Sequence, residues 1–313
     1  MKKIRKILFI ADGSPSEMNA LRRAVQLAGE FGAALTVMDT VERYSSASSD
    51  LVIQQAVTAL QASAIRERRQ KLERMVKPIL GGSGVKYSVE VAAGTGYVEA
   101  IRLVQKLKIG LVMKAATGGS ALLRLFGDAD MHLLRMCPCQ VWIARPTRHK
   151  RHARILAAVD TSAGDAVSNA LNRLIVDSAA NIAELEDAEL HVVHAWRLLG
   201  EPSMRADLYP MPEDVLAKLR ADTRARHERD LGALLRRYRD RDIKLHIREG
   251  APASVIQSLV KSKKIDLLVM GTVSRSGVAG MLLGNTAESI LHKVNCALLT
   301  LKPSTFKTPI KPG

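Results

Sequence analysis

The residues best suited to bind a small anionic ligand lie in the second half of the chain. A run rich in Gly, Ser and Thr extends from Gly271 to Thr286 and precedes a helical pattern over residues 287–294. Glycines let the backbone approach a ligand closely, and the first turn of a helix offers free N–H groups to phosphate. Asp160 follows a short apolar run and can accept hydrogen bonds from an amine or a ribose hydroxyl. These residues favour a phosphorylated ligand; the alternative is that the glycines only form turns and Asp160 only caps a helix.

No motif for catalysis accompanies these residues. The sequence contains no G-x-x-x-x-G-K-[ST], no G-x-G-x-x-G and no G-x-S-x-G. His191 and His194 are three apart on an expected strand and point to opposite faces, so they cannot chelate one metal ion together. His132 and Asp130 are two apart on an expected helix and do not face each other. We expect no catalytic residue and no metal site, with a slow ATPase or autophosphorylation activity as the alternative.

The elements that must position this loop occur twice in the chain. The segments 6–12 and 154–160 each have a basic residue, a short apolar run, an Asp and then small turn residues. Continuous apolar runs of this length are typical of buried parallel strands. Later segments match in the same order: strands over 34–41 and 189–196, helices over 47–80 and 213–238, strands closing on Gly over 88–94 and 245–250, strands over 109–114 and 265–271, and strands over 140–145 and 297–302. Strands that alternate with helices predict two α/β domains with parallel sheets.

The composition agrees with two globular domains. The chain has 313 residues, of which 47% are hydrophobic and 25% charged, so each half can bury its own core. We expect a first domain over 1–147, a second over 153–303, a basic linker over 145–152, and a loose tail over 304–313 that contains Pro309 and Pro312.

The formal net charge of +16 favours anionic partners such as nucleotides, nucleic acid or anionic lipid. The alternative is that Lys and Arg only coat solvated helix faces. No apolar run approaches the roughly 20 residues that a membrane-spanning helix needs. Asp12 ends the apolar start of the chain too early for a signal peptide. We therefore expect a cytoplasmic protein without a membrane partner.

The three cysteines are too few for a disulfide framework. Two of them form the sequence Cys137-Pro138-Cys139, which is neither a C-x-x-C redox motif nor half of a paired zinc site. We expect these cysteines to occupy packing or turn positions.

The order of the elements, the Asp after the first strand and the Gly-rich run after the fourth resemble the universal stress protein family, in its tandem two-domain form. The resemblance covers nearly the whole chain except the linker and the tail. It implies that each domain has a five-stranded parallel sheet in the order 3-2-1-4-5 with helices on both faces. It also implies that the two domains pack as an internal pseudo-dimer and that the ligand is ATP or another adenine nucleotide, with or without Mg²⁺.

Nucleotide-binding members of this family carry the pattern G-x2-G-x9-G-[S/T/N]. The resemblance assigns these positions of the second domain to the nucleotide: Asp160 to adenine or ribose, the Val192 backbone to the base, Met270 and Gly271 to the ribose side, Ser274 to the second Gly of the pattern, and Gly284, Asn285 and Thr286 to phosphate. Ser274 departs from the pattern, and a Ser at a position that needs positive φ costs about 1 kcal/mol, although its hydroxyl can donate a hydrogen bond.

The first domain departs further from the pattern. It retains Asp12, Val37, Gly118 and Gly127. However, Ala115 replaces the first Gly, the spacing to Gly127 is one residue short, and the carboxylate of Asp128 follows at the phosphate position. Like charges repel, so phosphate is disfavoured there. We expect this first site to be degenerate, either empty or adapted to a different ligand.

Three functions remain open from the sequence. The leading one is a stress-response protein that binds ATP or a related ligand in its second domain and acts through ligand-modulated contacts with a protein partner. The alternatives are a nucleotide-independent adaptor and a basic nucleic-acid-associated protein. We rank the last lowest because no RRM, KH or helix-turn-helix signature is visible. The identity of the partner, and whether the pseudo-dimer forms a further homodimer, are left open.

Overall fold

The computed structural model of the chain describes residues 4–117, 127–145, 152–198, 200, 211–272, 284–291 and 293–313, without the side chains of residues 285 and 286. The first half contains β1 (Lys6–Ile10), α1 (Glu17–Phe31), β2 (Ala34–Val41), α2 (Leu51–Leu80), β3 (Tyr87–Ala93), α3 (Gly96–Leu107), β4 (Leu111–Ala115), α4 (Asp128–Met136) and β5 (Gln140–Ala144). The second half contains β6 (Arg154–Val159), α5 (Ala166–Glu186), β7 (Glu189–Trp196), α7 (Glu213–Leu235), β8 (Ile243–Glu249), α8 (Pro252–Ser262), β9 (Leu267–Gly271), α9 (Asn285–Leu291) and β10 (Ala297–Leu301).

All ten strands form one sheet in the order β3-β2-β1-β4-β5-β10-β9-β6-β7-β8. Within each half the strands pair in parallel, so the expected order 3-2-1-4-5 is confirmed in both copies. The two halves join where β5 and β10 pair antiparallel, with Ile143 opposite Leu298. The expected pseudo-dimer is therefore a continuous sheet, and the pairing removes the sheet edge that each half would otherwise expose.

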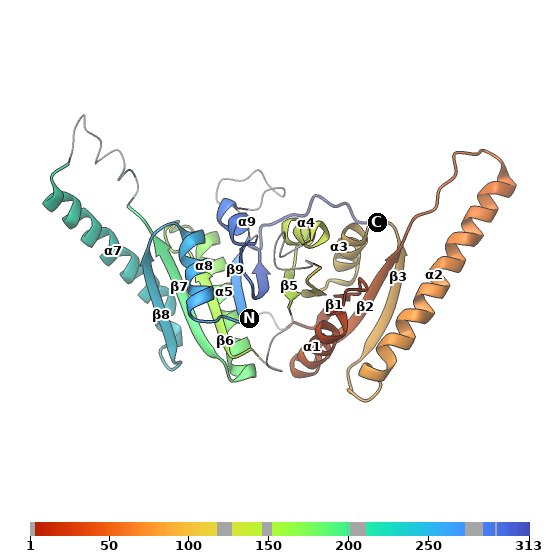
Figure 1. Ribbon diagram of the computed structural model, residues 1–313, viewed down its shortest axis with the longest axis horizontal. Helices are drawn as coiled ribbons and strands as arrows, with labels where there is room; N and C mark the ends of the chain where they lie inside the picture. Colours follow the sequence, from red (N-terminus) through yellow and green to blue (C-terminus); the bar gives the residue numbers. More distant parts are fainter. Residues whose placement is uncertain are drawn as a thin grey trace.

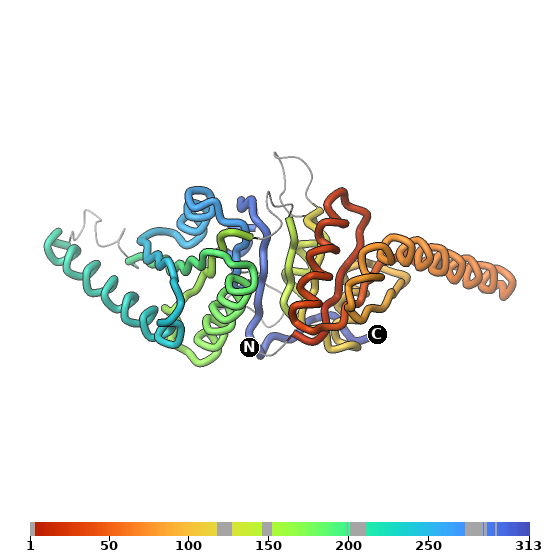
Figure 2. The backbone as a smooth tube through the Cα atoms, turned by 90° about the horizontal axis from the view of Figure 1, so that it is seen from below, coloured from red at the N-terminus to blue at the C-terminus, as the bar shows by residue number. Residues whose placement is uncertain are grey.

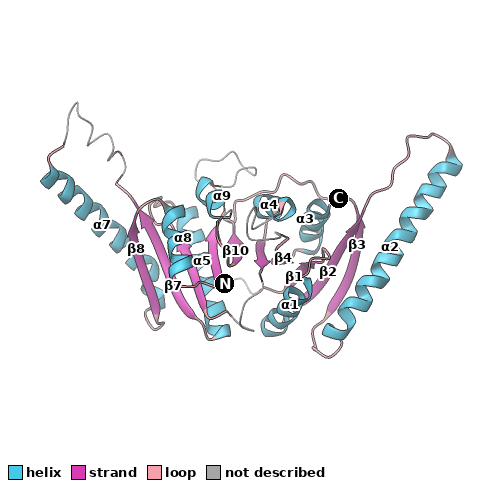
Figure 3. Cartoon of the chain, in the orientation of Figure 1, coloured by secondary structure: helices cyan, strands magenta, loops and turns pink. Residues whose placement is uncertain are grey.

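Helices cover both faces of this sheet (Figures 1 and 3). One core lies against α1, α2, α5 and α7, and the other lies against α3, α4, α8 and α9. Successive side chains of each strand enter opposite cores: in β1, Phe9 faces the first core and Leu8 faces the second. This two-sided burial explains why the strands read as continuous apolar runs in the sequence.

The two longest helices lie at opposite ends of the molecule (Figures 1 and 2). α2 begins four residues later than the sequence predicted, because the Asp50 side chain accepts a hydrogen bond from the Val52 N–H and so caps the helix. In α2 the buried residues are Leu72, Val76 and Leu80, all in its C-terminal part. The N-terminal part of α2 is therefore exposed, and it projects beyond the sheet.

The last residues lie against the first half rather than hanging loose. The backbone carbonyl of Ile310 accepts a hydrogen bond of 3.1 Å from Gln105 of α3, and the Ile310 side chain packs against the second core. The ring of Phe306 lies 4.3 Å below the ammonium of Lys302. The prolines of this segment prevent a helix but allow an extended chain to follow the surface. Among the described helices, none combines the length and apolarity that crossing a membrane requires.

Candidate functional site

The candidate ligand site of the second half lies where β6 and β9 end side by side. Ala158 pairs with Met270, so Asp160 and Thr272 follow their strands at the same edge of the sheet. The Gly284 N–H donates a 3.0 Å hydrogen bond to the carbonyl of Thr272, which holds the start of α9 against this edge. Ligands of open parallel sheets bind at the carboxyl ends of neighbouring strands. The structure thus brings Asp160, Met270, Gly271 and Gly284 to one region.

Asp160 does not cap the following helix. That role belongs to Asp165, whose carboxylate accepts hydrogen bonds from the N–H groups of Val167 and Ser168 at 2.9 and 2.8 Å. Asp160 instead accepts hydrogen bonds from the N–H and hydroxyl of Ser162, and both of its backbone polar groups bond to the Asn172 side chain. Its side chain is exposed. The carboxylate is therefore positioned at the mouth of the site.

Val192 is not brought to this edge. It pairs with Ala157 on one side and Leu245 on the other, and its side chain is fully buried in the first core. A residue in the middle of two strand ladders has its backbone hydrogen bonds committed to the sheet. Because Val159 pairs with His194, the residue of β7 that lies beside Asp160 is Ala195. Val192, whose backbone the resemblance assigned to the base, lies three residues before this strand end.

Two buried hydroxyl groups at this edge have no hydrogen-bond partner among the described residues. Thr161 is 7% exposed and Thr272 is 2% exposed, and neither Oγ1 has a hydrogen-bond partner within the part of the chain that the structure describes. A buried hydroxyl without a hydrogen bond costs about 1–3 kcal/mol, and each such group in a native protein needs an explanation. Both residues directly follow the positions that the sequence singled out.

Gly271, at the end of β9, packs closely against a side chain of α5. A Cβ atom at this position would lie 3.0 Å from Cδ2 of Leu171 on α5. Asn285 and Thr286 are the first two residues of α9, which begins two residues before the helix that the sequence predicted over 287–294. Ser274 and Gly118 lie outside the described residues.

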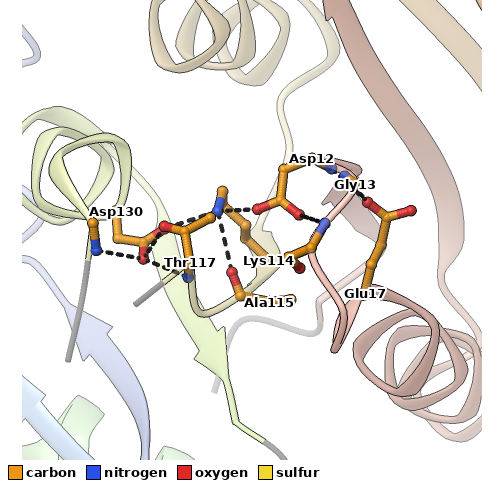
Figure 4. Close-up of polar contacts among 9 residues, drawn as sticks. Asp12, Gly13, Glu17, Lys114, Ala115, Thr117 and Asp130 are labelled. Carbon is orange, nitrogen blue, oxygen red and sulfur yellow. Dashed lines mark hydrogen bonds and ion pairs between the residues drawn. The ribbon is translucent and has the colours of Figure 1, made fainter. Parts of the chain in front are cut away.

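The corresponding edge of the first half is closed by a charge cluster, drawn in Figure 4. Lys114, the penultimate residue of β4, is 3% exposed, and its ammonium contacts the carboxylate of Asp12 and lies 2.9 Å from Oδ1 of Asp130. Asp130, which is fully buried in the first turn of α4, accepts hydrogen bonds through Oδ2 from the N–H and hydroxyl of Thr117 and from the Gly127 N–H. The protein's own carboxylate thus occupies donors that could otherwise bind an anion.

The second half has apolar residues at these two positions. Lys114 pairs with Ile10 of β1, as Met270 pairs with Ala158 of β6, and Asp130 is the third residue after Gly127, as Ala287 is the third after Gly284. Sequence reasoning missed Lys114 and Asp130 as site residues. The available signal was a lysine inside an otherwise apolar strand. Val37, like Val192, is fully buried in mid-strand.

In each half, two polar side chains connect the second strand (β2 or β7) with the long helix (α2 or α7). In the first half, Asp39 accepts a 2.6 Å hydrogen bond from Nε of Arg68, and burial raises the pKa of the Asp39 carboxyl. In the second half, His194 Nε2 lies 3.0 Å from Nδ1 of His227. Because His194 Nδ1 lies 3.2 Å from the Val159 carbonyl, which only accepts, neutral His194 donates from Nδ1 and accepts a hydrogen bond from His227 Nδ1–H through Nε2. Burial lowers the pKa of both imidazoles.

Three further histidines among the described residues also find partners that the sequence did not reveal. His191 Nδ1 lies 2.9 Å from Nε2 of His246 on β8, and their rings stack with centroids 5.2 Å apart. His132 stacks on Tyr97. The expectation that His191 and His194 point to opposite faces is met, since each pairs with a different histidine. No cluster of three His, Cys, Asp or Glu side chains suited to a metal ion occurs among the described residues.

Comparisons with known proteins show the family of the chain. The model of the universal stress protein family matches residues 3–145 and 152–302. Universal stress protein E of Escherichia coli K12 is 28% identical over 99% of this chain and 98% of its own length, and the homologue from Haemophilus influenzae is 28% identical over 96% and 98%.

Two solved structures share the fold of the whole chain. A protein of unknown function from Pseudomonas aeruginosa PAO1 is 27% identical and superposes with a TM-score of 0.71, covering 96% of this chain and 93% of that one. A universal stress protein from Archaeoglobus fulgidus, 18% identical, shares the fold with a TM-score of 0.62 over 96% of this chain and 99% of that one. The chain therefore belongs to the universal stress protein family, in the tandem two-domain form of universal stress protein E.

Proposed function

We propose that this chain is a stress-response protein that binds ATP or a related adenine nucleotide in its second domain and thereby modulates contacts with a protein partner. The single observation that carries the proposal is the pair of buried Thr161 and Thr272 hydroxyls without described partners at the carboxyl edge of β6 and β9. The first domain satisfies the matching edge internally through Asp130. The contrast supports one ligand site rather than two.

The residues at the second edge fit an adenine nucleotide. Asp160 and the backbone near Ala195 would meet the base or ribose, and Met270 and Gly271 would lie on the ribose side. Thr161 and Thr272 would supply hydroxyl donors, and the segment Gly284–Thr286 would face phosphate. Bound Mg²⁺ would neutralise phosphate charge. We propose no catalytic step; a slow ATPase or autophosphorylation activity is the alternative. We also propose that the protein acts in the cytoplasm.

One ion pair connects α9, which begins at the proposed site, with α4 of the first domain. The carboxylate of Glu288 on α9 forms a 2.6 Å ion pair with Arg135 of α4, and the backbone N–H of Glu288 donates a hydrogen bond to the carbonyl of Gly284. A ligand that prefers one position of α9 would therefore bias the contact between the two domains. Only such a difference in affinity between two states can make a ligand a switch.

The test is calorimetric titration of the full chain with Mg·ATP. Thr272→Val is the sharpest variant, because it removes a hydroxyl while keeping the shape of the side chain. We expect it to weaken nucleotide binding by about tenfold, the effect of one hydrogen bond, and to stabilise the ligand-free protein because it removes an unsatisfied hydroxyl.

Asp160→Ala should abolish measurable binding, while Asp12→Ala, the matched change in the first domain, should leave the affinity unchanged. Absence of binding heat together with an unchanged melting temperature in Mg·ATP would refute the proposal.

A nucleotide-independent adaptor is the second candidate, and the exposed part of α2 favours it. Leu51, Val52 and Leu60 are 66, 72 and 56% exposed, and residues 51–65 contain no charge. Partner binding that is unaffected by Asp160→Ala and by added ATP, but lost on Leu60→Ser, would favour the adaptor.

A further inference from the structure

The two neighbouring cysteines at the end of α4 lie in contact. Cys137 is the C-cap of α4 and is fully buried, whereas Cys139, just before β5, is partly exposed. Their sulfur atoms are 3.6 Å apart. A disulfide requires a separation of about 2.05 Å, so the two sulfurs need only approach each other over a short distance. Pro138 between them restricts the backbone of the turn that holds both thiols on the same side.

A buried cation lies beside this pair. Lys302, directly after β10 and 8% exposed, donates from Nζ to the carbonyls of Leu134, Arg135 and Cys137 at 2.9, 2.8 and 2.9 Å. These carbonyls belong to the last turn and the cap of α4, where a positive charge is favoured. Lys302 of the second domain thus links the end of α4 to the junction between the two domains, where β5 pairs with β10.

The two thiols differ in chemical character. The hydrogen bond from Cys139 Sγ lowers the pKa of the Cys137 thiol, and the charge of Lys302 acts in the same direction. The same hydrogen bond and burial raise the pKa of the Cys139 thiol. The third cysteine, Cys296, is buried, and burial raises the pKa of its thiol to about 12. The thiolate is the reactive form, so Cys139 and Lys302 favour Cys137 as the nucleophile of the pair, and a peroxide reaches this buried sulfur from the side of the partly exposed Cys139.

We propose that Cys137 and Cys139 form a reactive dithiol that hydrogen peroxide or another small hydroperoxide oxidises to an intrachain disulfide. The Cys137 thiolate attacks one peroxide oxygen, the O–O bond breaks, and with one proton taken up the products are a Cys137 sulfenic acid and one water. The Cys139 thiol then attacks the Cys137 sulfur, the S–O bond breaks, and a second water leaves with the thiol proton. Two thiols and one peroxide give one disulfide and two waters.

This site is separate from the proposed nucleotide site, and none of its residues takes part there. Its position lets the modification affect the junction between the two domains, where β5 pairs with β10. Cys137 contributes one of the three carbonyls that hold Lys302, and Cys139 immediately precedes β5, which pairs with β10. Closing the disulfide changes the turn between them. Because the ring encloses only one intervening residue, it gains little from chain entropy, and we expect thiol reductants to reopen it.

The experiment treats the reduced full chain with one equivalent of hydrogen peroxide, then alkylates it under denaturing conditions and measures its mass. We expect free thiols to fall from the three of the reduced chain to one, with loss of two hydrogen atoms and a peptide that links Cys137 to Cys139. Cys296→Ser is the matched control and should form the same disulfide. Cys139→Ser should instead accumulate a Cys137 sulfenic acid that dimedone traps.

Lys302→Met should slow the oxidation near neutral pH and move the pH at which its rate is half-maximal upward, because the cation that favours the Cys137 thiolate is gone. Retention of three thiols in the wild-type chain would overturn the proposal. Bonds to Cys296 or between chains, or gain of oxygen without loss of hydrogen, would overturn it too.

Discussion

Lys114 Nζ lies 2.9 Å from Asp130 Oδ1, and both side chains are almost completely buried. This contact joins the end of β4 to the first turn of α4, and Lys114 also reaches Asp12 after β1 (Figure 4). Removing one partner of a buried ion pair leaves an uncompensated charge, which typically costs about 3–5 kcal/mol.

Lys114→Met should therefore lower the free energy of unfolding by about 3–5 kcal/mol in urea titrations. The double variant Lys114→Met with Asp130→Ala introduces the residues of the second domain, Met270 and Ala287, and should recover part of this loss. A single variant as stable as the wild type would show that the ion pair contributes nothing to the fold.

The register of β7 predicts different effects for two residues of one strand. Val192→Ala removes buried methyl groups from the core and should cost about 2 kcal/mol of stability without changing nucleotide affinity. Ala195→Leu adds bulk at the edge beside Asp160 and should weaken nucleotide binding with a smaller effect on stability. Melting curves and calorimetric titrations of both variants check this. Weaker nucleotide binding in Val192→Ala, with unchanged binding in Ala195→Leu, would instead indicate that Val192 contacts the base.

Stability should fall as the pH decreases from about 6.5 to 4. Burial, with a smaller contribution from His191, lowers the pKa of His246 to about 4, whereas an unfolded histidine titrates near 6.5. In this interval the unfolded chain binds a proton that the folded chain does not, so unfolding becomes easier by at most about 1.4 kcal/mol per pH unit for each such group. Urea unfolding at pH 7.5 and pH 5 should show the decrease, and His246→Asn should reduce the slope. Parallel slopes for the two proteins would contradict this assignment.

The two ends of α2 should respond differently to truncation. Leu60 is 56% exposed and Leu72 is 3% exposed. Leu72→Ala should cost about 2–5 kcal/mol because it opens a cavity, whereas Leu60→Ser should change stability by less than about 0.5 kcal/mol. Thermal melts of the two variants are sufficient. A large loss on Leu60→Ser would mean that the N-terminal part of α2 is packed in solution.

Much of the fold could be predicted from local patterns. The apolar runs ending at Asp12 and Asp160 indicated buried parallel strands, and their repetition indicated two domains of one type. Gly271 and Gly284 were placed correctly at the edge of the sheet because strand ends follow from the same runs. The mid-strand position of Val192 could not be predicted, because a buried strand shows no sign of where its neighbour ends.

The sequence by itself determined the α/β class and the duplication, because hydrophobic periodicity and turn residues act over short distances along the chain, whereas the strand order followed from the resemblance to the family. The tertiary structure decided what depends on residues far apart in sequence: the Lys114–Asp130 contact, the His194–His227 pair, the register that brings Ala195 beside Asp160, and the cation that Lys302 places beside Cys137 and Cys139. The physical reason is that a charged or polar side chain shows its type in the sequence, whereas its energy and reactivity depend on the partner and the burial that folding supplies.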